Sequence, residues 1–287
     1  MLPRAYPGPT RRTAVGPGRR VRVVRVCGRY ASSWNPLDLG DHFAVERIDP
    51  VSDDAQQAGT GSSGRAAAGL PPDWNVAPTK TVYAVLERCR PDDLDARPVR
   101  RLRPVRWGLV PSWARDPKAG NSMINARVET AATKPAYRRA LAARRCLLAT
   151  DRPADGYYEW GAGPDGTKTP YFIRPRAGGV LAMAGLYELW CDPHRPHADP
   201  TAWLWSAVII TTRAVGELRH LHDRMPVFVE PEHYAAWLDS GRTDPVAARA
   251  LLAPAPPGRL VAHPVSPAVG NVANNGPQLA VPLPAFP

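Results

Sequence analysis

Four short stretches of the sequence place reactive polar side chains between apolar segments. They are Cys27-Gly28-Arg29-Tyr30, residues 122–130, residues 153–160 and residues 220–227. The stretches contain, in turn, a thiol, the amide of Asn125, the carboxylate of Glu159 and the imidazole of His222. A thiol is a nucleophile, and carboxylates and imidazoles transfer protons, so these residue types suit covalent catalysis.

Each of these residues also has an ordinary structural explanation. A lone Cys beside Gly is usually a small buried residue, and Glu159 could be a carboxylate paired with an Arg. His220 and His222 have the spacing of two ligands on one face of a strand, but no third ligand accompanies them, so we expect no metal. The residues alone leave catalytic and structural roles open.

The composition fits a globular chain with only a weak preference for anionic partners. Of 287 residues, 44% are hydrophobic. No run approaches the roughly 18 apolar residues of a membrane helix, so we expect no membrane contact. The net charge is +11, but residues 1–26 hold seven Arg and no acidic residue, which leaves +4 for the remainder. The four Cys are scattered and indicate a reducing cytoplasm.

Strands are the main elements that must position the reactive residues. Runs rich in β-branched and aromatic residues predict strands at 81–86, 104–110, 170–175, 179–190 and 201–212. Proline start signals and apolar spacing predict helices at 36–45, 134–145, 232–238 and 244–253. Strands and helices do not alternate, so we predict one α+β domain over residues 27–287 with curved, mostly antiparallel sheets. Residues 1–26 are predicted to be a disordered leader, and about 51–73 a flexible insertion.

Six further motifs follow Cys27-Gly28-Arg29-Tyr30 in an order that resembles the SOS response-associated peptidase (SRAP) family. They are WNVAPTK (74–80), RWGLVPSWA (106–114), MINARVET (123–130), PADGYYEW (153–160), HDRMPV (222–227) and HPVSPAVGNVANNGPQL (263–279). The resemblance covers the chain from Cys27 to about Leu279. It implies a single SRAP-like domain with a barrel-like core and a few flanking helices, and no cofactor.

The resemblance also implies a substrate and a set of roles. Cys27 would crosslink to the ring-opened aldehyde of an abasic site in single-stranded DNA as a thiazolidine, shielding the lesion. Glu159 is matched to general acid–base catalysis, His222 to a second proton transfer, and Asn125 to hydrogen bonding around the Cys27 amine. The candidate DNA ligands are Arg29, Arg127 and Arg224 for phosphates, and Trp74, Trp107 and Trp113 for stacked bases. We expect a cytoplasmic, nucleoid-associated monomer.

A thiazolidine requires Cys27 to be the first residue, because only a terminal Cys carries a free α-amine beside its thiol. In the family, this Cys follows the initiator methionine. Here Val26 precedes it, and a valine codon can start bacterial translation. We therefore expect translation to begin at Val26 or, alternatively, a leader that is cleaved off.

Two other functions stay open at this stage. A thiol (auto)peptidase would use Cys27 with His222, although strand alternation would point the neighbouring Asp223 away from His222. A non-catalytic DNA-binding module would use the basic residues alone. The Arg run at 138, 139, 144 and 145 is expected to form a solvated helix face rather than a DNA contact.

Overall fold

The computed structural model describes residues 28–33, 35–51, 69–89, 97–150, 156–162 and 167–284. The predicted leader 1–26, Cys27 and most of the insertion predicted at 51–73 lie outside these ranges. The upper bound of that insertion is wrong. The Leu70 amide donates a hydrogen bond to the Tyr83 hydroxyl at 3.0 Å, and Asp73 begins a strand.

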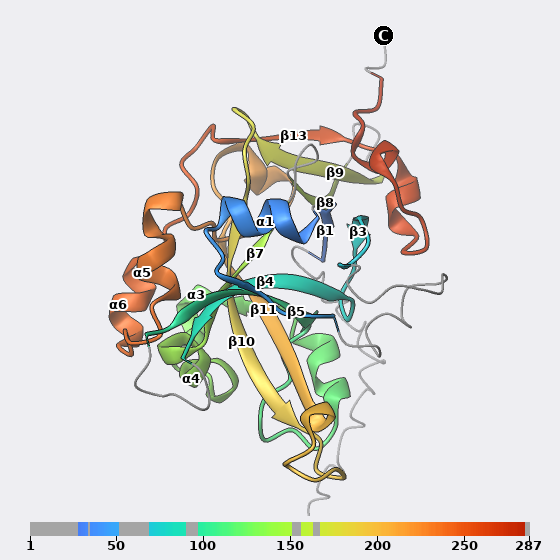
Figure 1. The fold of residues 1–287 in the computed structure, drawn as a ribbon. Helices are drawn as coiled ribbons and strands as arrows, with labels where there is room; N and C mark the ends of the chain where they lie inside the picture. Colours follow the sequence, from blue (N-terminus) through green and yellow to red (C-terminus); the bar gives the residue numbers. More distant parts are fainter. Residues whose placement is uncertain are drawn as a thin grey trace, which may run out of the picture.

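Five antiparallel strands form the smaller sheet, in the order β13–β9–β8–β1–β3. Their bounds are β1 Arg29–Ser32, β3 Asp73–Val76, β8 Tyr157–Ala162, β9 Lys168–Pro175 and β13 Leu260–Pro264. β1 lies between β3 and β8, so Tyr30 is opposite both Val76 and Tyr157. The first described strand is therefore an inner strand, held on both edges (Figure 1).

Eight strands form the larger sheet, and five of them close into a barrel. The bounds are β2 Arg47–Ile48, β4 Thr81–Arg88, β5 Val99–Trp107, β6 Asn125–Arg127, β7 Arg145–Ala149, β10 Ala182–Cys191, β11 Trp203–Arg213 and β12 Arg224–Pro226. Neighbours run β11–β10–β7–β4–β5, and β5 pairs again with β11. The predicted α+β class with mostly antiparallel sheets and a barrel-like core is confirmed.

The strand predicted at 104–110 begins five residues earlier and ends three residues sooner. Its first half is rich in Arg, which hides the apolar pattern, and the structure pairs these side chains across the sheet. Arg100 contacts Glu87 at 2.8 Å, and Arg101 contacts the buried Asp49 at 2.6 Å. The strand ends at Trp107 because Gly108 has a φ of +123°, where a side chain would be strained, and a Cβ there would lie 2.5 Å from the Gly120 carbonyl oxygen.

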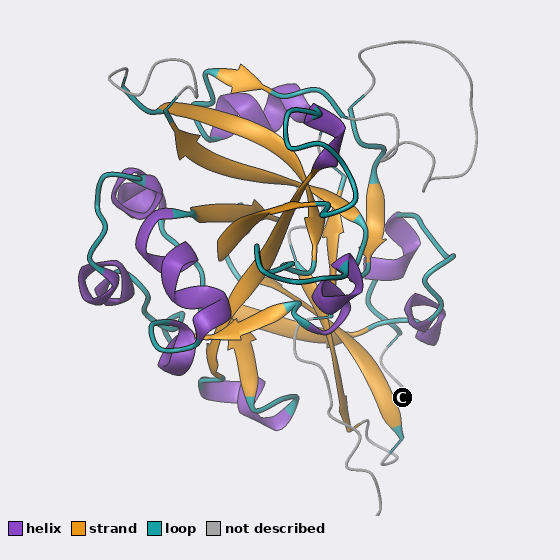
Figure 2. Ribbon diagram, turned by 90° about the horizontal axis from the view of Figure 1, so that it is seen from below, coloured by secondary structure: helices purple, strands orange, loops and turns teal. Residues whose placement is uncertain are grey.

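Helices surround the sheets, and α3 to α6 gather along one side of the barrel (Figures 1 and 2). The α-helices are α1 Pro36–His42, α3 Val128–Ala131, α4 Pro135–Ala143, α5 Tyr234–Leu238 and α6 Pro245–Ala250. Short 3₁₀ turns occupy η1 Pro117–Ser122, η2 Pro200–Ala202, η3 Gly216–His220, η4 Pro231–His233, η5 Pro267–Gly270 and η6 Pro277–Ala280. All four predicted helices are present, each close to its predicted start.

The predicted solvated Arg face is wrong for two of its four members. Arg138 and Arg139 are exposed on α4, but Arg144 pairs with Glu188 at 2.6 Å. Arg145 is 2% exposed and donates hydrogen bonds to backbone carbonyls of α4 and of the segment that ends α5, including Trp237 O at 2.6 Å. A guanidinium has five N–H donors, so one buried Arg satisfies the carbonyls that helix ends leave unpaired.

Alternating side chains of β4 join two separate apolar clusters. Tyr83 and Val85 pack with the helices, whereas Val82 and Ala84 pack with residues of the smaller sheet such as Tyr157. This is the period-two pattern of a strand buried on both faces. One cluster packs barrel strands against helices. The other cluster packs barrel strands against the smaller sheet and places β8 near β11 and β12.

Candidate functional site

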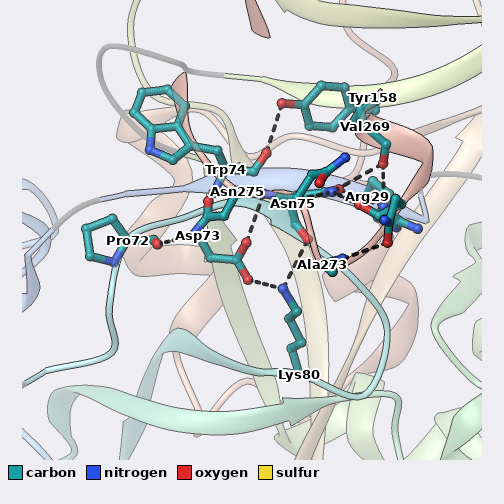
Figure 3. Close-up of polar contacts among 12 residues, drawn as sticks. Arg29, Pro72, Asp73, Trp74, Asn75, Lys80, Tyr158, Val269, Ala273 and Asn275 are labelled. Atoms are coloured by element: carbon teal, nitrogen blue, oxygen red, sulfur yellow. Dashed lines mark hydrogen bonds and ion pairs between the residues drawn. The ribbon is translucent and has the colours of Figure 1, made fainter. Parts of the chain in front are cut away.

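A buried amide, Asn75 in β3, holds the start of β1 in place (Figure 3). Arg29 Nη1 donates to Asn75 Oδ1 at 2.6 Å and to the Val269 carbonyl at 2.8 Å. Burial lowers the pKa of Arg29, partly offset by Asp73 and Tyr158. Arg29, predicted as a phosphate ligand, therefore spends much of its donor capacity inside the protein.

The same amide binds the C-terminal segment, residues 265–279. Asn75 Nδ2 lies 3.2, 2.9 and 3.0 Å from the carbonyl oxygens of Val269, Asn271 and Asn274. Asn275 adds a second clamp, since its Oδ1 accepts from the Trp74 amide and its Nδ2 donates to Pro72 O (Figure 3). Residues almost 200 positions apart in the sequence are thus joined beside the start of β1.

Glu159 is buried in β8, with 2% of its surface exposed. Arg29 of β1 lies opposite Tyr158, the residue that precedes Glu159 on β8. In an antiparallel pair, this register places Gly28 at the carboxylate's position along β8. A buried carboxylate on a strand that adjoins the start of β1 makes Glu159 a candidate for proton transfer.

His222 lies in the turn between η3 and β12, close to β8. It lines a pocket of about 500 Å³ together with Trp160, Gly161 and Lys168. The approach is tight, because a Cβ on Gly161 would lie 2.8 Å from Leu221 Cδ2. Glu159 and His222 are 63 positions apart in the sequence, and the fold places the segments that carry them side by side.

The surroundings of His222 favour its neutral form. Desolvation by burial is the main cause that lowers its pKa; Lys168 and Arg224 add to the effect and Asp223 opposes it. Nδ1 lies 2.7 Å from Asp223 Oδ1 and 3.1 Å from the Arg224 amide, which donates to it. The expectation that Asp223 points away from His222 is wrong, because residues 222 and 223 lie in a turn rather than in a strand.

Asn125 and Arg127 lie on β6, which pairs in parallel with the end of β11. Ala126 between them is fully buried in the core, so the two flanking residues take the alternate face of the strand. Asn125 is half-buried, and its carbonyl oxygen lies 3.5 Å from the Tyr137 hydroxyl. Arg127 is exposed, as a residue that binds DNA phosphates must be.

Arg224 has a different environment from Arg127. It is 7% exposed and makes a bidentate pair with Glu129 at 2.7 and 2.9 Å, and Nη2 donates to Thr211 O at 2.6 Å. The hydrogen bonds from Arg224 lower the pKa of Glu129. With its fork occupied, Arg224 holds β12 to β11 and α3, which corrects its predicted role as a direct phosphate ligand.

The three predicted stacking residues fall in three different environments. Trp107 is 0% exposed, and its indole N–H donates to Ile124 O at 3.1 Å, so it is a core residue and its predicted base contact is wrong. Trp74 is half-buried and packs beside Tyr158, whose hydroxyl donates to Trp74 O at 2.9 Å. Trp113 is 68% exposed and offers an open ring face.

The sequence interpretation missed Asn75 and two Arg residues near His222. Asn75 stands in the quoted WNVAPTK motif as a polar residue before an apolar pair, which was a usable signal. Arg213 and Arg219 line one pocket with Arg127, which lies far from both of them in the sequence, and the three residues follow no pattern. The pairing of β6 with β11 and the position of η3 after β11 bring them together.

The described part of the chain has neither a cluster of metal-ligand residues nor a helix that could span a membrane. There, no group of three or more His, Cys, Asp or Glu residues is arranged to hold a metal ion. Within those same ranges, no helix has the length and apolar character that crossing a bilayer requires.

The closed barrel, the second sheet packed on it and the polar residues between them define a barrel-centred α+β protein with one composite site. The family model described as "SOS response associated peptidase (SRAP)" matches residues 26–272. The chain belongs to this family, and the resemblance seen in the sequence is confirmed.

Relatives with known names support the same grouping. The abasic site processing protein YoqW of Bacillus subtilis is 37% identical over 254 residues, which cover 88% of this chain and 98% of YoqW. The abasic site processing protein HMCES of Gallus gallus is 30% identical over 235 residues, or 74% of this chain and 66% of HMCES. The fold alone is shared with a solved Bacteroides thetaiotaomicron protein at 19% identity and a TM-score of 0.68, over 90% of this chain and 100% of that one.

Proposed function

We propose that this protein processes abasic sites in single-stranded DNA by capturing them covalently through Cys27. The relatives are named for abasic site processing, which supports the substrate. The observation that carries the proposal is the pairing of β1 with β8, since its register sets Gly28, the residue after Cys27, level with the buried Glu159.

The capture begins with the ring-opened sugar, which presents an aldehyde carbon. The α-amine of Cys27 adds to this carbon, and water leaves as an imine forms. The thiol sulfur then bonds to the imine carbon while its proton passes to the nitrogen, which closes a five-membered thiazolidine. Because the amine and the thiol must belong to the same residue, the reactive protein begins at Cys27.

Two buried groups are suited to the proton transfers. Ring opening of the sugar hemiacetal needs an acid and a base, and we assign this role to Glu159. His222 is held neutral by its surroundings and can accept a proton in ring opening and return it when the crosslink reverses. Asn125, whose side chain can donate and accept, is assigned to the Cys27 amine and the ring that it forms.

The test mixes protein that begins at Cys27 with an abasic single-stranded oligonucleotide and looks for a species that survives denaturation. Cys27→Ser should abolish this species. Glu159→Gln should slow its formation by about a hundredfold or more, the range expected for loss of one proton-transfer group, while affinity for undamaged DNA stays within about threefold. Equal losses of crosslinking and binding would mean that Glu159 is structural.

The same preparation separates the competing functions. A thiol peptidase would cleave added peptides without any aldehyde present. A binding module would give only a complex that dissociates in denaturant and weakens with salt. Either of these results, in the absence of a crosslink, would overturn the proposal.

A further inference from the structure

A second pocket, here called the basic pocket, adjoins the pocket that holds His222. It has a volume of about 810 Å³, and the two pockets share Asp223 in their walls. The charged residues that line it are Arg127, Glu129, Arg213, Arg219, Asp223 and Arg224. Four cationic side chains therefore face two anionic ones beside the candidate catalytic residues.

The acidic residues of the basic pocket are already engaged. Glu129 is held by both Nη atoms of Arg224, and Asp223 contacts His222. Arg127, Arg213 and Arg219 are exposed, and none of them forms an ion pair or a side-chain hydrogen bond with another residue in the described ranges. Within the described residues, three guanidinium groups of this pocket are thus available to bind an anion.

Strand register places three of the Arg residues in one row. Arg213 of β11 lies directly opposite Arg224 of β12, and Thr211, two residues earlier on the same face of β11, lies opposite Arg127 of β6. Like charges directly opposite each other across a sheet are destabilising. Glu129 pairs with Arg224 and its charge also acts on Arg127, so the repulsion that remains is the one between Arg213 and Arg224, which a bound anion would reduce.

The spacing of the row suits a polyanion better than a single ion. Positions two residues apart on a strand are separated by about 7 Å, comparable with the distance between neighbouring phosphates of an extended nucleic acid strand. Arg219 approaches from η3, on a separate element. A guanidinium binds phosphate oxygens through a planar fork, so three such groups in one pocket match a run of phosphodiesters.

We propose that Arg213 and Arg219, together with Arg127, form a phosphate site that binds the DNA strand on one side of the lesion. This inference rests on the proposed function and adds to it the residues that read one flank of the substrate. Arg224 supports the site by holding Glu129 away from the phosphates.

The test compares Arg213→Ala/Arg219→Ala with a matched control, Arg242→Ala/Arg249→Ala, which removes the same charge from exposed positions on the α5–α6 side. Binding to undamaged single-stranded DNA is measured against salt concentration. The first variant should bind about tenfold more weakly or worse, and its salt slope should fall by about 1.4, or 0.7 for each lost phosphate contact. The control should change the slope by less than about 0.5, and Arg213→Lys/Arg219→Lys should keep most of the affinity.

A second arm tests whether the pocket is a site or only a long-range charge. Crosslinking is followed with two oligonucleotides, one carrying the abasic site near its 5′ end and one near its 3′ end. Arg213→Ala/Arg219→Ala should slow capture of one substrate and leave the other within about twofold. Equal effects on both substrates, or an effect equal to that of the control variant, would overturn the inference. Because binding to undamaged DNA does not require Cys27 chemistry, the first arm stands even if no crosslink forms.

Discussion

Replacing Asn75 by Ala should loosen the contact between β3, the start of β1 and the C-terminal segment. Asn75 is 0% exposed, and its side chain reaches Arg29 and three backbone carbonyls. All of these partners would lose a hydrogen bond in a place that water does not reach freely. The variant therefore tests how the fold holds the strand that follows Cys27.

The expected size of the effect follows from the donors and acceptors. An NH₂ group has two protons, so the three carbonyls around Nδ2 share two hydrogen bonds. Each neutral bond contributes about 1 kcal/mol net, and the bond from the charged Arg29 about 1.5–3 kcal/mol. The sum predicts a loss of about 3–5 kcal/mol in the free energy of unfolding.

Urea unfolding measures this loss directly. At a slope of about 2–3 kcal/mol per M, the midpoint should fall by about 1–2.5 M. Asn274→Ala is the matched control, because Asn274 donates a single hydrogen bond at the surface, to Ala268 O at 2.8 Å, and should cost less than about 1 kcal/mol. Asn75→Asp keeps the acceptor for Arg29 but turns a carboxylate toward three carbonyl oxygens, so it should be at least as damaging. A stable Asn75→Asp protein would refute the assigned network.

Three further predictions concern ionisable groups. The pKa of His222 is lowered in the folded protein, so its neutral form contributes stability above the ordinary His pKa of about 6.5, and this contribution is lost as pH falls through the folded-state pKa. Between pH 7.5 and 5, the urea midpoint should therefore fall more for the native protein than for His222→Gln. Glu129→Gln should cost about 1–2 kcal/mol at pH 7 by urea unfolding and should reduce the loss of stability as acid protonates Glu129, since Arg224 lowers that pKa. Arg145→Lys should lower the unfolding free energy by more than about 2 kcal/mol, because an ammonium cannot span the carbonyls of Trp237 and Leu141; an unchanged melting temperature would show that these bonds are dispensable.

The sequence was sufficient for the fold class because the strands are long and their turns are marked. Runs such as residues 203–213 are mostly β-branched or aromatic, and this composition favours a strand. Short strands were missed. β6 has three residues and β12 has three, and each exists only because it pairs with the end of β11. Tertiary pairing, which no local pattern encodes, creates them.

The candidate site was partly predictable for the same reason. Glu159 and His222 lie in motifs with reactive residues and fall in adjoining positions in the fold. Burial could not be predicted, and it removed Trp107 from the candidate DNA surface while Trp113 stayed exposed. A Trp in an apolar motif looks the same in sequence whether its ring fills the core or faces solvent.

Arg127 and Arg224 show most clearly how environment separates residues of one type. Both lie in motifs that suggest phosphate binding, and both face the basic pocket. Arg224 is buried, and an unpaired charge there would be costly, so Glu129 and Thr211 must satisfy it. Arg127 is exposed, and its side chain forms no ion pair or hydrogen bond with the part of the chain that the structure describes. The position of a single carboxylate, Glu129, thus determines which guanidinium is held inside the fold and which stays exposed to solvent.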